Sequence, residues 1–214
     1  MPVRKIKFVK GEYYHIYNRG VDKRSIVCDP YDSNRFVQSL DVFNDTELTG
    51  SLYELSFITS KNKSRKKLVD IIAYCLNPNH FHFILEQISP DGISKFMHRI
   101  SGGHSWYFNN KYKRKGALFQ GVFKAKHILG NDYLLHLSAY VNLNDQVHKL
   151  GGPAAKLVRS SWPEYFTGEK GLCNKGIIKK QFKTQQEYEK FCETSLLLMV
   201  EKKTDAELDA IYHE

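Results

Sequence analysis

The sequence predicts a mixed α+β fold in which helices cover an antiparallel sheet, and three observations predict it. Residues 70–76 form a near-continuous apolar run, and the turn residues 77–79 join it to an alternating segment that begins at residue 80, as in a β-hairpin. Residues 13–19 are dense in aromatic and β-favouring side chains and end at a glycine. Elsewhere, apolar residues recur at helical spacing.

The predicted strands have distinct faces. In residues 13–19 the alternation places Tyr13, His15 and Tyr17 on one face. Residues 118–128 also alternate and predict a strand with a basic face.

Helical spacing predicts four helices, which cover residues 30–43, 92–112, 132–144 and 184–203. Asp29 is a suitable N-cap for the first helix, and Asn131 or Asp132 for the third. The pair Gly102 and Gly103 weakens the second, because glycine is a poor helix former.

Positive charge is concentrated in the first two thirds of the chain. The net charge is +9; residues 1–144 hold 21 Lys and Arg against 12 Asp and Glu, whereas residues 145–214 hold 11 of each. Residues 61–67 carry five positive charges and predict an exposed loop or helix start, and residues 111–126 hold six positive charges and no negative one. A localised basic excess suits binding of a polyanion, although a solvated basic surface would have the same composition.

Length and composition predict one well-cored domain, residues 1–150, followed by a loop-rich and helical extension, residues 151–214. The four cysteines form no paired motif, which disfavours a zinc ribbon or a disulfide scaffold and fits a reducing compartment. We find no signal-peptide pattern and no apolar stretch long enough to span a bilayer, so we expect a cytoplasmic protein with no membrane partner.

A pair of histidines is the most informative feature of the hairpin. A strand that begins at residue 80 would project His80 and His82 from one face while Phe81, Phe83 and Leu85 point into a core. Two neutral imidazoles side by side make half of a metal site. Two half-exposed histidines on an amphipathic strand would have the same spacing, so the pair alone leaves both interpretations open.

Tyr140 and Asn144 lie four residues apart in one predicted helix, so they differ by only about 40° around its axis. Both can address one point beside the apolar stripe of Leu134, Leu137 and Val141. For any one of 13 tyrosines, packing or a surface hydroxyl is the ordinary alternative.

Four sequence blocks follow one another between residues 13 and 147, and they are residues 14–20 (YHIYNRG), 74–82 (YCLNPNHFH), 116–124 (GALFQGVFK) and 133–144 (YLLHLSAYVNLN). In these blocks the chain resembles the single-tyrosine HUH (IS200-like) transposases, especially the REP-associated tyrosine transposases. The resemblance implies an α+β sandwich of the ferredoxin-like or RRM-like type, with an antiparallel central sheet. The His-hydrophobe-His strand would lie at its centre and the tyrosine on a neighbouring helix.

Carried over residue by residue, the resemblance makes Tyr140 the catalytic nucleophile, and His80, His82 and Asn144 the ligands of a divalent metal, Mg²⁺ or Mn²⁺. A phenol ionises near pH 10 and is a poor nucleophile at neutral pH, so an ion that polarises the scissile phosphate would lower the barrier. Attack would leave a 5′-phosphotyrosine link and a free 3′ hydroxyl, which allows later rejoining without ATP. His15 is a candidate supporting residue, or else a buried histidine bonded to a neighbour.

The chain departs from the usual family pattern at two positions. Asp145 stands where a proline commonly follows the asparagine, which bears on how the tyrosine helix ends. Val122 stands where an arginine commonly follows Gln-Gly, which removes one phosphate contact.

The expected partner is single-stranded or hairpin DNA, because family members recognise imperfect hairpins of extragenic palindromic repeats. Basic side chains would contact phosphates, and aromatic side chains would stack on unpaired bases. The predicted contacts are Lys111, Lys113, Arg114, Lys115, Lys124 and Lys126, with Trp106, Tyr107 and Tyr112. A solvated loop beside a packed aromatic helix would show the same residues.

The leading hypothesis is a single-stranded DNA endonuclease and strand transferase, that is, a transposase acting at hairpin DNA. A non-catalytic hairpin-DNA-binding protein, a rolling-circle-type replication initiator and an RNA-binding protein with aromatic side chains on its sheet are the alternatives. The presence of His80, His82 and Tyr140 together argues against a pure binding module. The sequence leaves monomer and homodimer equally open.

Overall fold

The computed structural model describes residues 6–47, 50, 52, 54, 66–167 and 171–201. Its centre is a five-stranded antiparallel sheet with the strand order β4-β1-β3-β2-β5. The strands are β1 (Tyr13–Arg19), β2 (Val69–Leu76), β3 (His80–Gln87), β4 (Lys124–His127) and β5 (Arg159–Ser160). Residues 61–65 of the predicted basic segment lie outside the described residues.

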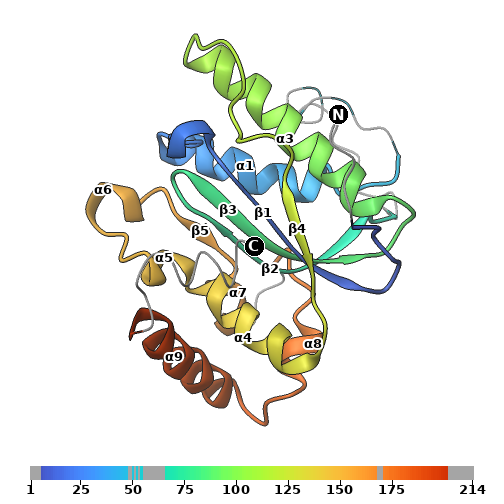
Figure 1. Ribbon diagram of the computed structural model, residues 1–214, viewed down its shortest axis with the longest axis vertical. Helices are drawn as coiled ribbons and strands as arrows, with labels where there is room; N and C mark the ends of the chain where they lie inside the picture. The colour runs from blue at the N-terminus through green and yellow to red at the C-terminus, as the bar shows by residue number, and fades with distance from the viewer. Residues whose placement is uncertain are drawn as a thin grey trace.

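Helices cover both faces of this sheet. Figure 1 shows α1 and α3 on one side of the sheet and α4 with α9 on the other, which confirms the predicted α+β sandwich. The helices of the described residues are α1 (Pro30–Val42), α3 (Gly92–Lys111), α4 (Asn131–Asn142), α5 (Asn144–Val147), α6 (Gly152–Ala155), α7 (Trp162–Phe166), α8 (Gly176–Lys179) and α9 (Gln185–Glu201), with a 3₁₀ turn η1 (Val21–Lys23). Within the described ranges, no helix combines the length and apolar character that crossing a bilayer requires.

The alternation of β3 decides which face receives the histidines. Phe81, Phe83 and Leu85 are fully buried in the core beneath α1 and α3, as predicted. Burial of each such side chain stabilises the fold by about 1.5–3 kcal/mol. Because neighbouring residues of a strand point to opposite faces, this packing turns His80 and His82 toward the α4 face.

Three predicted helix ends can now be compared with the structure. The side chain of Asp29 caps α1 as predicted, accepting a hydrogen bond from the backbone of Asp32. The predicted cap of α4 is wrong: its N-cap is Gly130, whose φ of 102° allows the chain to reverse after β4. The predicted single helix over 132–144 is also wrong at its end, because α4 stops at Asn142 and Asn144 begins the separate helix α5.

The predicted strand over residues 118–128 is shorter than expected, since only β4 (Lys124–His127) is regular. Before β4 the chain makes a single bridge from Phe119 to Gly20 and then turns at Gly121, whose φ is 72°. A turn that requires a left-handed backbone interrupts a ladder even where the sequence alternates.

Helix α3 runs without a break through Gly102 and Gly103, the pair that was expected to weaken it. A Cβ atom at Gly103 would lie 3.2 Å from the ring of Phe43 at the end of α1. Glycine therefore allows α1 and α3 to approach closely, and this packing compensates for the poor helix propensity.

The extension after residue 150 is built onto the same sheet. Ser160 of β5 pairs with Cys75 of β2, and α9 packs along α4. The sheet therefore includes residues from both sides of position 150, and the domain boundary expected there stays a prediction.

Candidate functional site

Strand register arranges the face beneath α4 in rows. In antiparallel strands, directly paired residues project to the same side of the sheet. His82 on β3 pairs with Tyr17 on β1, which in turn pairs with Lys124 on the edge strand β4. In the row nearer the β2–β3 turn, His80 pairs with Arg19. The two histidines are thus flanked on the β4 side by basic residues.

His82 is held by its neighbours. It is 1% exposed, and its Nδ1 lies 2.9 Å from Nε2 of His15. One nitrogen donates to the other, so the contact ties the His82 ring to β1. The His80 ring lies next to it, with the ring centroids 5.2 Å apart and the planes at 84°.

Each ring nitrogen of His80 lies within hydrogen-bond distance of a side-chain amide oxygen. Oδ1 of Asn79, 2.6 Å from Nδ1, accepts a hydrogen bond when Nδ1 carries the hydrogen. In that neutral tautomer Nε2 bears the lone pair. That nitrogen lies 3.0 Å from Oδ1 of Asn144, so a nitrogen and an oxygen that can both bind a cation converge.

Tyr140 and Asn144 reach this point from successive helices. Tyr140 on α4 is 2% exposed, and its ring centroid lies 5.4 Å from that of His82. Asn144 is fully buried at the start of α5. The structure therefore brings the predicted nucleophile, the three predicted metal ligands and His15 together from one chain, although the helix predicted to hold Tyr140 and Asn144 is two helices.

The extension supports the tyrosine helix. Ser161 Oγ donates to Asn142 Oδ1 over 2.5 Å, and Asn142 Nδ2 donates to the hydroxyl of Tyr188 on α9 over 3.0 Å. The same hydroxyl lies 3.1 Å from Ser138 Oγ, one turn before Asn142. These buried bonds fasten the end of α4 that carries Tyr140 to the sheet and to α9.

Two residues of the site were missed by reasoning from the sequence. Asn77, interpreted as a turn residue, contacts both His80 and Asn144. The ring of His148 lies 4.9 Å from that of His80, and its position four residues after Asn144 was an available signal. Across the described part of the chain, no three His, Cys, Asp or Glu side chains are grouped so that they could hold a metal ion.

Comparison with known families gives this arrangement a context. Residues 46–144 match the family model described as transposase IS200 like, and this segment contains His80, His82, Tyr140 and Asn144. This segment belongs to the IS200-like transposase family. No curated protein sequence matches the chain. A solved REP-associated tyrosine transposase bound to a REP hairpin has the same fold, with a TM-score of 0.53 and 14% identity over 80% of this chain and 90% of that one.

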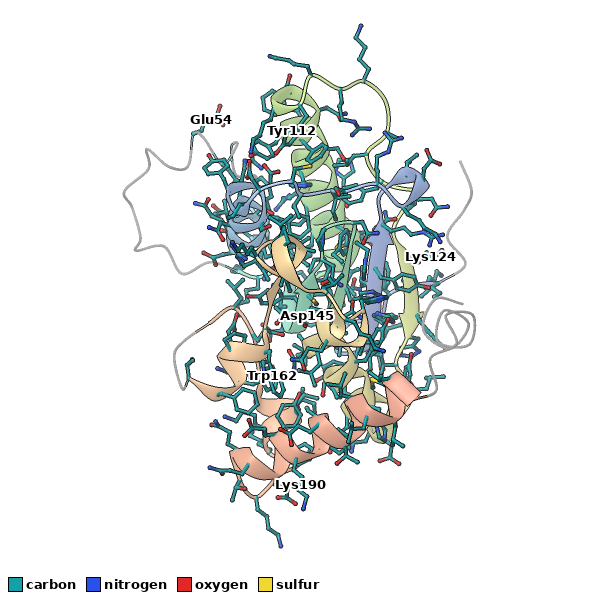
Figure 2. The ribbon with its side chains drawn as sticks, turned by 90° about the vertical axis from the view of Figure 1, so that its left-hand side faces the viewer. Glu54, Tyr112, Lys124, Asp145, Trp162 and Lys190 are labelled. Atoms are coloured by element: carbon teal, nitrogen blue, oxygen red, sulfur yellow. The ribbon has the colours of Figure 1, made fainter. Side chains whose placement is uncertain are left out.

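The predicted DNA contacts of this IS200-like transposase separate into two places. Figure 2 shows Tyr112 at the end of α3 and Lys124 on the edge strand, well apart. Lys124 and Lys126 lie on β4 beside the site, with Lys124 Nζ 5.9 Å from the centroid of the Tyr17 ring. The other predicted contacts lie on α3 or just after it, and they are Trp106, Tyr107, Lys111, Tyr112, Lys113, Arg114 and Lys115.

Three of the contacts predicted on α3 join a network around the fully buried Asp32. Lys111 Nζ forms ion pairs with Asp29 and Asp32, while the hydroxyls of Tyr107 and Tyr112 donate to Asp32 over 2.6 and 2.7 Å. Trp106, in contrast, is 70% exposed. A DNA role for this group stays a prediction, since Lys111 is already paired within the chain.

We expect Asp32→Asn to lower the free energy of unfolding of the transposase by about 2–4 kcal/mol, because it removes a buried, hydrogen-bonded charge. Burial by itself would raise the pKa of Asp32, but hydrogen bonds from Lys111, Tyr107 and Tyr112 outweigh it and lower the pKa from 3.8 to about 2. A carboxylate with a lowered pKa stabilises the fold above about pH 4 and ceases to do so as pH falls through 2.

Urea unfolding of Asp32→Asn between pH 7 and pH 2 measures both effects, with Asp22→Asn as the control. Asp22 forms an ion pair with Arg24 but is 81% exposed, so its loss should change stability by less than about 0.5 kcal/mol. Equal losses of unfolding free energy in the two variants would show that the buried Asp32 network stabilises the fold no more than an exposed ion pair does.

Proposed function

We propose that this transposase is a metal-dependent endonuclease and strand transferase that acts on single-stranded, hairpin-containing DNA through Tyr140. One observation supports the proposal most: Tyr140 packs against His82 while Asn144 Oδ1 lies 3.0 Å from His80 Nε2. The proposed nucleophile therefore lies beside the proposed metal-binding residues, of which His82 and Asn144 are buried and His80 is half-buried. The fold shared with a transposase bound to a REP hairpin supports a DNA hairpin as the ligand.

The donor set fits a divalent cation that His80, His82 and Asn144 would hold. With Nδ1 donating to Asn79 Oδ1, His80 offers the lone pair of Nε2, and Asn144 adds an amide oxygen. The bound ion would polarise the scissile phosphate and stabilise the charge that develops on it. Mixed nitrogen and oxygen ligands suit Mn²⁺ better than Mg²⁺, so Mn²⁺ is the first ion to test.

Tyr140 supplies the covalent step. Its hydroxyl oxygen attacks the phosphorus and forms a phosphotyrosine ester, the bond between phosphorus and the 3′ oxygen breaks, and the departing oxygen gains a proton as Tyr140 loses one.

The edge strand is the natural entry for the DNA backbone. We expect Lys124→Ala combined with Lys126→Ala to weaken binding of single-stranded DNA about tenfold at low salt. Because two phosphate contacts are lost, the slope of log K against log salt concentration should also become less steep by about 1.4. Fluorescence anisotropy over a salt series measures both quantities.

The matched control for this charge change is Lys180→Ala combined with Lys190→Ala. Both residues are exposed, and they lie after α8 and on α9, with Lys190 at the bottom of Figure 2, away from Lys124. Equal weakening by the two pairs would mean that net charge alone, rather than the β4 edge, determines the affinity.

The test of the function is a covalent adduct. The protein is incubated with Mn²⁺ and a DNA hairpin that carries single-stranded flanks, and the products are separated on a denaturing gel. A 3′ label should move into the protein band and a 5′ label into a shortened free fragment, because Tyr140 keeps the 5′ phosphate. Hairpin binding without an adduct in Mn²⁺ or Mg²⁺ would instead support a non-catalytic binding protein.

A further inference from the structure

The turn between β2 and β3 contains a fully buried asparagine beside the site. Asn77 Nδ2 donates to Asn144 Oδ1 over 2.6 Å and lies 2.9 Å from His80 Nε2. In the tautomer with the hydrogen on Nδ1, His80 Nε2 accepts from the same amide group. Both hydrogens of the Asn77 amide thus point at atoms that the proposed function assigns to the metal.

To bind a metal ion, the side-chain amide of Asn144 must be oriented with its oxygen toward His80. An asparagine side chain has an oxygen at one end and an NH₂ group at the other, and only the oxygen binds a cation. The Nδ2 atom of Asn144 is buried and makes no hydrogen bond with the described residues. The orientation of the amide therefore depends on the groups at its oxygen end, where Asn77 is the donor.

Asn77 is itself oriented by its neighbours. The thiol of Cys75 donates to Asn77 Oδ1 over 3.5 Å, and the backbone N–H of Asn77 donates to the carbonyl of His80 over 2.8 Å. With its oxygen directed at Cys75, its NH₂ group can only face Asn144 and His80.

We propose that Asn77 is a positioning residue that holds Asn144 with its oxygen toward His80 and thereby prepares the metal site. The inference rests on the proposed function in one respect, the role of Asn144 as a ligand. The nitrogen of His80 has a single lone pair, which an ion and Asn77 cannot share. The oxygen of Asn144 has two, so the bond from Asn77 to Asn144 is compatible with a bound ion.

The test is Mn²⁺ affinity of the full chain without DNA, measured by electron paramagnetic resonance of the free ion. Asn77→Leu keeps a similar shape and removes the donor, and Asn77→Ala serves as a second variant. Loss of one net hydrogen bond predicts a dissociation constant raised about three- to tenfold. Thermal unfolding shows that each variant is folded at the temperature used.

The same substitutions are then made in an Asn144→Asp background. A carboxylate has two oxygens, so either of its orientations presents one to the ion. In this background, removal of Asn77 should change the Mn²⁺ dissociation constant less than about twofold. Equal weakening in both backgrounds would assign Asn77 a packing role, and unchanged affinity in both would show that Asn144 is oriented without it; either result overturns the proposal. Absence of Mn²⁺ binding by the unsubstituted chain would overturn the metal site itself, which is a different failure.

Discussion

Tyr140→Phe should abolish the covalent protein–DNA adduct, with a loss of at least about 10³-fold, and leave hairpin affinity within about twofold. The substitution removes only the nucleophilic oxygen. The ring that packs against His82 at 5.4 Å is retained, so the buried face of α4 and the proposed metal ligands keep their places. Quantitative denaturing gels give the adduct yield, and anisotropy at the same salt concentration gives the affinity.

Tyr17→Phe is the control that makes this result specific. Tyr17 also lies beside His82, with ring centroids 5.8 Å apart, and it is buried. Burial, with a smaller contribution from Tyr133, raises the pKa of Tyr17 to about 12, which disfavours its phenolate. An adduct that survives Tyr140→Phe and disappears in Tyr17→Phe would reassign the nucleophile to β1.

The parts of the fold that sequence predicts well depend on local periodicity. Strand β3 and the direction of His80 and His82 follow from alternation over a few residues, and a turn signal marks where the strand begins. The Asp29 cap of α1 is local as well, because the donor it serves lies three residues away.

What sequence could not predict depends on contacts between distant segments. The bond from Asn77 to Asn144 joins residues 67 positions apart, and the ion pair that occupies Lys111 joins it to Asp29, 82 positions away. Strand β5 is two residues long and exists only because β2 offers an edge. Periodicity within one segment does not show which distant residues are in contact. The sequence therefore predicts the individual residues of the candidate site but not the hydrogen bonds that support them.

His80→Ala and His82→Ala should each reduce adduct formation in Mn²⁺ about 10³-fold, since an ion contributes several kcal/mol to phosphate chemistry and each change removes a proposed ligand. Hairpin affinity should change less than about threefold, because the basic edge strand is untouched. Adduct formation is measured over a Mn²⁺ series, so that a weakened site is seen as a shifted midpoint and a lost site as a lost plateau.

His148→Ala is the discriminating control for the two ligands. Its imidazole lies as near to His80 as His82 does, at 4.9 against 5.2 Å between ring centroids, but on a different element. If position beside His80 were sufficient for function, His148→Ala would match the loss in His82→Ala. We expect less than a tenfold effect, because the strand places His80 and His82 on one face toward Tyr140. Equal losses would show that the ligand set extends to His148 and that its composition must be redrawn.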